Sequence, residues 1–250
     1  MLQNREGQSV PKVTFKTRAG DAWVERTSDE IFRGRTVVVF GLPGAYTPTC
    51  SSSHVPRFNE LADTLKRNGV DEILCVSVND AFVMNQWQTD QKADRITFLP
   101  DGNGEFSEKM GMLVDKSDLG FGKRSWRYSM LVRDSVIEKM FIERDQPGDP
   151  FEVSDADTML RYINPGAKQP EVAFLFTRVG CPHCARAKAL LQKHGVTYEE
   201  AVVGVQVTSR AVRAAVNQST VPQIFIDGRY IGGADELERY YANRSTAAGV

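Results

Sequence analysis

The sequence predicts an α/β protein of two domains, the first with a mixed sheet. Strand patterns alternate with amphipathic helix patterns along residues 36–162. A stretch with two prolines and a glycine follows at 164–170, and the same alternation then starts again. A chain of 250 residues is long enough to bury two modest cores. We therefore expect domains at 1–163 and 171–243, joined by a linker at 164–170, and a tail at 244–250.

The elements of the first domain follow from apolar spacing and from turn and cap signals. Residues 1–35 are expected to form short strands and turns, with 28–30 leading into the first buried strand. The predicted strands are 36–42, 72–78, 96–99, 126–132 and 136–143, the last two joined as a hairpin by 133–135. Three helices are predicted. The first begins at Cys50 and is closed by 68–69, the second covers 81–93, and the third opens at 154–157 and runs through Tyr162. In the second helix, Phe82, Val83 and Trp87 are expected on the apolar face.

The second domain repeats this alternation on a smaller scale. An Asp-Gly pair at 227–228 is a hairpin turn signal. The predicted strands are 172–176, 197–203 and 223–226, and the predicted helices are 181–194, 209–218 and 234–241.

Charge and hydropathy exclude several classes of function. The chain has 31 basic and 32 acidic residues, so we expect no nucleic-acid partner. No apolar run is long enough to span a bilayer, and the N-terminus lacks the apolar core of a signal peptide. We therefore expect a cytoplasmic protein without a membrane partner. Four cysteines are too few and too scattered for a secreted disulfide framework, so the question is which of them react.

Cys50 stands where a predicted buried strand gives way to a predicted helix. The free N–H groups and the dipole at a helix N-terminus favour a thiolate, which is the nucleophilic form of cysteine. Thr47 lies on the same turn and can offer its hydroxyl to the sulfur or to a bound oxygen. The spacing Pro43-x-x-x-Thr47-x-x-Cys50 resembles the active-site signature of the peroxiredoxins, and the run 46–54 is most similar to their type-5 branch.

This resemblance implies a thioredoxin-like fold and reduction of hydroperoxides at Cys50. In the type-5 branch, an arginine directly before an aromatic-Ser-Met sequence assists the thiolate, and this position is Arg127 rather than Arg124. His54 follows Cys50 by one helical turn, and we expect it to support the site rather than to transfer a proton. Cys75 lies in an apolar strand, where an inert buried thiol is expected rather than a resolving cysteine.

The run Cys181-Pro182-His183-Cys184 has its own chemistry. Cys181 is expected at the exposed start of a helix as the nucleophile, and Cys184 one turn inside the helix with a secondary role. A zinc site would need a second pair of ligands, and none lies nearby in the sequence, so we expect no metal.

Together with the runs 220–222 and 232–235, this cysteine pair resembles glutaredoxin. The resemblance implies a second thioredoxin-like fold, a cis proline at Pro222, and binding of glutathione. Val221 would pair with the cysteine of glutathione, Asp235 would hold its γ-glutamyl end, and Arg178 would meet its glycine carboxylate. The implied contacts are Arg178, His183, Thr220, Val221, Pro222, Gly233, Ala234 and Asp235.

The fusion suggests a reaction cycle. No cysteine lies between Cys75 and the linker, so an oxidised Cys50 must be restored from outside its own domain. We expect no bound cofactor, glutathione as the electron donor with glutathione reductase acting indirectly, and Cys181 as the group that regenerates Cys50. Resemblance to bacterial hybrid proteins of this domain order implies a homo-oligomer, either a tetramer or a dimer.

Two other functions stay open. A sensor could relay the oxidation of Cys50, although a sensor does not need Thr47, Cys50 and Arg127 together. Alternatively, the second domain could reduce mixed disulfides of other proteins, with the first domain as a scaffold. Cluster binding by the glutaredoxin-like domain is a minor further option, which a colourless purified protein would disfavour.

Overall fold

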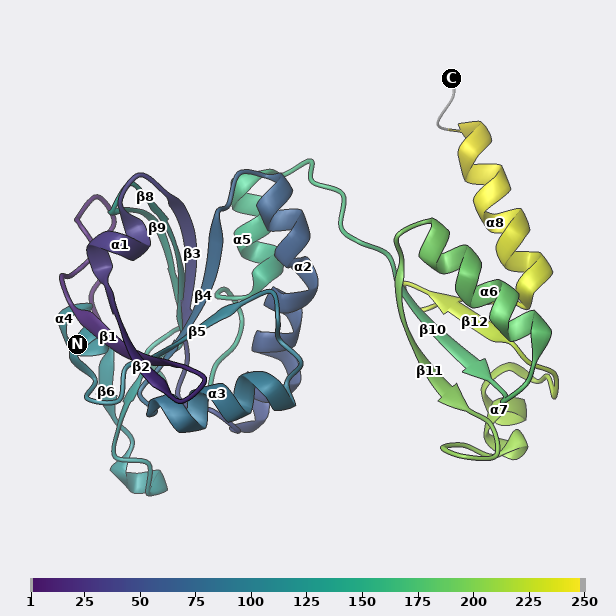
Figure 1. Ribbon diagram of the computed structural model, residues 1–250, viewed down its shortest axis with the longest axis horizontal. Coiled ribbons are helices and arrows are strands. Elements are labelled where there is room, and N and C mark those ends of the chain that lie inside the picture. Colours follow the sequence, from purple (N-terminus) through teal and green to yellow (C-terminus); the bar gives the residue numbers. More distant parts are fainter. Residues whose placement is uncertain (1, 248–250) are drawn as a thin grey trace. The chain divides into compact units, whose positions relative to one another are not determined.

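The computed structural model describes residues 2–247, with side chains for residues 2–244. The chain divides into two compact units, Met1–Gln169 and Pro170–Val250, each with its own sheet and helices (Figure 1). Separate hydrophobic cores form within the two units. No helix in the described part of the chain is long and apolar enough to cross a membrane.

The first unit is built on a five-stranded mixed sheet with the strand order β5-β4-β3-β8-β9. The first three of these strands are parallel, β8 is antiparallel to β3, and β8 and β9 form the hairpin that the sequence predicts. The strand bounds are β3 (Thr36–Gly41), β4 (Glu72–Ser77), β5 (Thr97–Pro100), β8 (Tyr128–Arg133) and β9 (Val136–Ile142).

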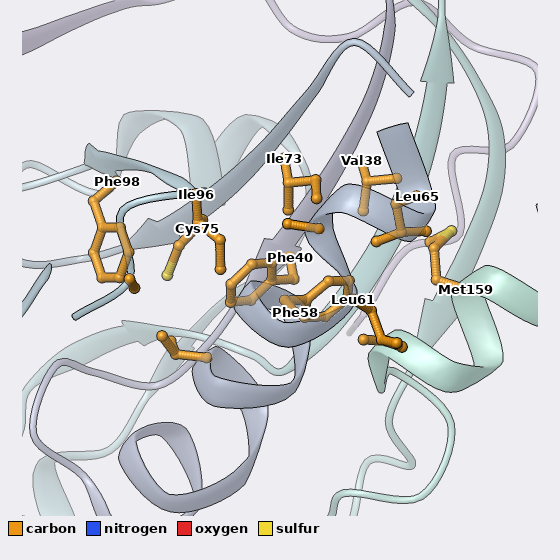
Figure 2. Close-up of a cluster of buried hydrophobic side chains, with 14 of the residues drawn as sticks. Val38, Phe40, Phe58, Leu61, Leu65, Ile73, Cys75, Ile96, Phe98 and Met159 are labelled. Carbon is orange, nitrogen blue, oxygen red and sulfur yellow. The ribbon is translucent and has the colours of Figure 1, made fainter. Parts of the chain in front are cut away.

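One face of this sheet is covered by α2 (Val55–Arg67), α3 (Ala81–Asp90) and α5 (Ala156–Ile163), and Figure 1 shows α2 and α5 side by side there. Successive side chains of a strand point to opposite faces, so Val38 and Phe40 enter the core under these helices. In Figure 2 the ring of Phe40 lies beside that of Phe58 from α2, and the two rings are stacked with centroids 4.2 Å apart.

The other face packs against short elements, with Phe15, Phe32 and Phe106 in its core. The prediction of only short strands and turns in residues 1–35 is wrong at 28–32, because Thr27 and Glu30 form a capping box that starts a helix there. Residues 28–30 still precede the first buried strand, β3. The remaining elements of this unit are β1 (Thr14–Ala19), β2 (Ala22–Thr27), α1 (Ser28–Phe32), α4 (Glu105–Lys109), β6 (Leu113–Asp115), a 3₁₀ turn (Ser117–Leu119) and β7 (Lys123–Ser125).

The predicted apolar face of α3 is partly wrong. Trp87 is buried as expected, but Phe82 is 59% exposed, and Met84 takes the inward position instead. Phe82 packs at the surface, with its ring 5.8 Å from that of Trp23 and the Arg18 guanidinium over it. A helix turns 100° per residue, so Met84 and Trp87 share a face that Phe82 cannot share.

The second unit has a four-stranded mixed sheet with the order β11-β10-β12-β13. Its core is formed by Leu175 and Ile224 from the sheet and Leu191 and Leu237 from two helices. The last helix continues to Ala247, beyond the end predicted at Tyr241, and the rest of the predicted tail, 248–250, lies outside the described residues. The elements are β10 (Val172–Thr177), α6 (Pro182–Lys193), β11 (Thr197–Val202), α7 (Ser209–Val216), β12 (Gln223–Ile226), β13 (Arg229–Gly232) and α8 (Ala234–Ala247).

Candidate active site

Cys50 begins a short π-helical segment, Cys50–His54, between the loop after β3 and helix α2. Single π-helical turns are rare in proteins, but many of those known lie at functional sites. The preceding loop is held by the Thr47 hydroxyl, which donates to the carbonyl of Gly44 at 2.9 Å. Pro43 is buried, and the Cys50 thiol is fully buried and not in a disulfide. The loop therefore fixes a single buried thiol at the start of a helical segment.

Arg127 is the residue just before β8, and it is 1% exposed. Its Nη2 donates to the Cys50 Sγ at 3.4 Å. Arg124 is used differently, because it donates to the backbone carbonyls of Val78 and Phe121. Of the two arginines considered from the sequence, Arg127 is therefore the one beside the sulfur.

His54 is fully buried, with Phe40, Phe58 and Phe151 around its ring. Its Nδ1 lies 3.0 Å from Nη1 of Arg127. An arginine can only donate, so Nδ1 accepts this bond and the proton of the neutral ring is on Nε2. Nε2 then donates to the Ser154 carbonyl at 3.1 Å.

The environment of His54 also fixes its charge. Burial, reinforced by the positive charge of Arg127, holds the pKa of His54 well below its usual range. A neutral imidazole that receives a bond from Arg127 orients the guanidinium and has no proton to give at Nδ1. The geometry is that of a supporting residue.

Asp149 is a partner of Arg127 that the sequence did not reveal. Its carboxylate accepts from Nε of Arg127 at 3.1 Å and also from Nη2, the nitrogen that faces Cys50. Burial alone would lower the pKa of Arg127, but the negative charge of a Cys50 thiolate, followed by the Asp149 carboxylate, raises it overall. Asp149 lies in a loop rich in proline and glycine, where the sequence signals a turn and gives no sign of the contact.

Cys75 lies in β4, and Figure 2 shows it among apolar side chains such as Ile96 and Phe98. It is fully buried and not in a disulfide. Burial, followed by the effect of Cys50, raises the pKa of the Cys75 thiol well above its usual range. A thiol that stays protonated is a poor nucleophile, in line with the inert role expected from the sequence.

In the second unit, Cys181 is the N-cap of α6, and its sulfur accepts from the backbone N–H of Cys184 at 3.1 Å. The two cysteines form a disulfide. Cys184 is buried, whereas Cys181 is partly exposed and lies 3.9 Å from the carbonyl oxygen of Val221. The peptide bond between Val221 and Pro222 is cis.

A cavity of about 470 Å³ lies beside the cis peptide bond between Val221 and Pro222. Arg178 borders a different cavity, of about 350 Å³, together with both cysteines. The cavity of about 470 Å³ is also lined by Arg186, which forms an ion pair with Asp235. The sequence did not single out Arg186. Seven of the eight residues expected to contact glutathione line the first cavity, namely His183, Thr220, Val221, Pro222, Gly233, Ala234 and Asp235.

Within residues 2–247, no three His, Cys, Asp or Glu side chains are grouped so that they could hold a metal ion.

Comparisons with known proteins match both units. The redoxin family model matches residues 5–160, and the glutaredoxin family model matches residues 173–231. The chain is 60% identical over 241 residues to the hybrid peroxiredoxin hyPrx5 of Haemophilus influenzae, covering 96% of this chain and all of that protein. It is 55% identical over 185 residues to the peroxiredoxin sll1621 of Synechocystis sp., covering 67% of this chain and 98% of the relative.

Solved structures agree with these matches. Reduced Prx3 from Vibrio vulnificus in complex with hydrogen peroxide superposes with a TM-score of 0.61 at 40% identity, covering 64% of this chain and 99% of that one. The α/β fold predicted from the sequence, thioredoxin-like in both domains, is confirmed. The chain is an oxidoreductase with peroxidase activity, and it belongs to the hybrid peroxiredoxins, in which a redoxin domain is followed by a glutaredoxin domain.

Proposed function

We propose that this protein is a glutathione-dependent peroxidase in which the glutaredoxin domain returns oxidised Cys50 to the thiol. The observation that carries the proposal is the buried Arg127 guanidinium, 3.4 Å from the Cys50 sulfur. A fixed, buried cation stabilises both the thiolate and the charge that develops on the peroxide oxygens. Pro43 is buried in the loop before Cys50, and the Thr47 hydroxyl, which donates to the Gly44 carbonyl in that loop, is the group that we propose meets the peroxide.

In the first half of the cycle, the Cys50 thiolate attacks one peroxide oxygen. A sulfur–oxygen bond forms, the oxygen–oxygen bond breaks, and water or an alcohol leaves after taking up a proton. The product is the sulfenic acid of Cys50. Hydrogen peroxide and organic hydroperoxides are the proposed substrates, and the relative from V. vulnificus solved with hydrogen peroxide supports the first of them.

In the second half, a glutathione thiolate attacks the sulfenic sulfur, which releases water and leaves a mixed disulfide on Cys50. The Cys181 thiolate attacks the glutathione sulfur, and Cys50 leaves as the thiol. A second glutathione then displaces Cys181, and glutathione disulfide is the product. Glutathione reductase regenerates glutathione outside this protein, so no bound cofactor is needed.

The larger cavity of the glutaredoxin unit supports this role. It joins the backbone of Val221 to the N-terminal turn of α8 at Asp235, and Cys181 lies beside Val221. A helix N-terminus suits the carboxylate of a γ-glutamyl group. Cys184 would act second, by closing the disulfide when no glutathione arrives.

We also propose a setting for the reaction. The bacterial cytoplasm is the proposed compartment, because thiols are kept reduced there. A homo-oligomer, a tetramer or a dimer, is the proposed assembly, in which segment 164–170 acts as the linker between domains.

The test is NADPH consumption with a hydroperoxide, glutathione and glutathione reductase, without any other thiol protein. Wild type should turn over, whereas Cys50→Ser and Cys181→Ser should each be inactive. Cys50→Ser should still reduce a small-molecule disulfide, because its glutaredoxin unit is unchanged. Equal turnover by wild type and Cys181→Ser would show that the fused domain is not the reductant. Inactive wild type would favour a glutaredoxin acting on the disulfides of other proteins.

A further inference from the structure

Glu143 is a charged residue with no place in the reaction proposed above, yet it is 1% exposed. It directly follows β9. Four donors meet at its Oε1, namely the backbone N–H groups of Glu152, Val153 and Ser154 at 2.8–2.9 Å and the Ser154 hydroxyl at 2.8 Å. Four hydrogen bonds that converge on one buried oxygen fix the backbone of 152–154.

A chain of hydrogen bonds connects this backbone to the Cys50 sulfur. The Ser154 carbonyl accepts the Nε2 proton of His54 at 3.1 Å, and this leaves Nδ1 free to accept from Arg127 at 3.0 Å. The other terminal nitrogen of Arg127 faces the Cys50 sulfur. Ser154 and His54 are both fully buried, so water cannot take the place of either contact.

Glu143 is also tied to Arg127 through the main chain. Its backbone N–H donates to the Arg127 carbonyl at 3.1 Å, and its own carbonyl accepts from the Trp126 indole at 2.9 Å. One residue thus holds the backbone of Arg127 on one side. Through Ser154 and His54, it holds the guanidinium of Arg127 on the other.

We propose that Glu143 is a positioning residue of the peroxidatic centre, and that it acts through Ser154 and His54 to hold the Arg127 guanidinium at the Cys50 sulfur. The inference rests on the proposed role of Cys50. What matters is the place of the acceptor oxygen rather than the charge, because Oε2 of Glu143 has no hydrogen-bond partner among the described residues.

Two conservative variants separate the effect of the position of the acceptor oxygen from the effect of the side-chain charge at residue 143. Glu143→Gln keeps the length of the side chain and an acceptor oxygen but loses the charge. Glu143→Asp keeps the charge but withdraws the acceptor by one methylene group. Displacing a guanidinium by about one ångström costs on the order of a hundredfold in rate. We therefore expect Glu143→Asp to react with peroxide about ten- to a hundredfold more slowly, and Glu143→Gln within about threefold of wild type.

The measurement is the rate at which the reduced full-length protein loses its Cys50 thiol to one equivalent of hydrogen peroxide. The pH profile of Cys50 alkylation is recorded beside it, and it should move to higher pH in Glu143→Asp. Asp155→Ala is the matched control, because it removes the N-cap of α5 next to Ser154 without touching Glu143. Its peroxide rate should equal that of wild type.

Three outcomes would overturn the proposal. The first is a slow Glu143→Gln beside a fast Glu143→Asp, because charge would then matter rather than place. The second is a parallel loss of rate in Glu143→Asp and Asp155→Ala, which would indicate general loosening of the loop. The third is wild-type behaviour of Glu143→Asp. Cys50→Ser is run in parallel, because peroxide consumption by that variant would contradict the proposed function itself rather than the role of Glu143.

Discussion

At the scale of single residues, His54 is neutral because its surroundings disfavour the doubly protonated, positively charged ring. Burial and the Arg127 charge hold its pKa well below its usual range. A proton on Nδ1 would also remove the acceptor that Arg127 uses. An unfolded chain has neither constraint, and its histidine titrates near pH 6.5. Below that pH the unfolded state binds a proton that the folded state does not, so stability must fall as the pH falls.

This difference predicts a pH dependence for the first unit. Between pH 6.5 and 5, stability should decrease by up to about 1.4 kcal/mol per pH unit, and His54→Gln should lose most of that slope. The stability of the first unit at each pH is measured by urea unfolding with tryptophan fluorescence as the signal. All three tryptophans belong to this unit, and His54 is its one histidine of the three in the chain. Equal slopes for wild type and His54→Gln would contradict the assignment. The slopes are compared rather than the absolute stabilities, since the substitution has its own cost.

At the scale of elements, the pairing of β3 with β8 brings the end of β3 beneath a large ring. Gly41 is paired with Tyr128, and a Cβ at Gly41 would lie 2.2 Å from Cε1 of that ring. Tyr128 is fully buried and cannot move aside without disturbing the core. The close approach matters for the site, because the loop to Cys50 starts directly after Gly41.

Gly41→Ala should therefore destabilise the first unit by about 1–3 kcal/mol through overpacking. Gly102→Ala is the control, because its Cβ would meet nothing closer than 3.6 Å and its φ is not positive. We expect that control to stay within about 0.5 kcal/mol of wild type. The urea midpoint of the tryptophan signal decides between these outcomes. Similar midpoints for the two variants would show that the sheet can adjust at Gly41.

At the scale of the whole molecule, each of the two units encloses its own core. In the proposed cycle, a short tether between the two units converts their encounter into an intramolecular step, with an effective concentration on the order of millimolar. The fusion should therefore matter for turnover but not for the reaction of Cys50 with peroxide.

A protease recognition sequence inserted between Gln169 and Pro170 tests this expectation in the full-length protein. After cleavage, Cys50 should react with peroxide at the uncut rate. Glutathione-dependent turnover per active site should fall by about tenfold or more as the cut protein is diluted to micromolar concentration, whereas the uncut protein should not respond to dilution. A cut protein that also keeps its turnover on dilution would show that the tether is not needed.

Much of the fold and part of the site could be predicted from the sequence because they are local. The strand, loop and helix around Cys50 can be predicted from the spacing of apolar residues along that segment. The position of Cys181 at the start of a helix follows from the proline directly after it. The short elements between β5 and β8 escaped prediction, since 3–5 residues carry too little periodicity. Phe82 was misplaced, because an apolar residue type does not say which face a tertiary neighbour will cover.

The sequence by itself determined the order of the two units and the family, and it predicted Cys50 and Cys181 as the reactive cysteines. Only the tertiary structure decided what surrounds Arg127. Asp149, His54 and, through Ser154, Glu143 come from segments that the chain brings together only on folding, and His54 and Ser154 are 100 residues apart. The same holds for the pairing of Arg186 with Asp235, 49 residues away. Such contacts depend on side chains meeting across a folded core, and no local pattern in a single sequence records that meeting.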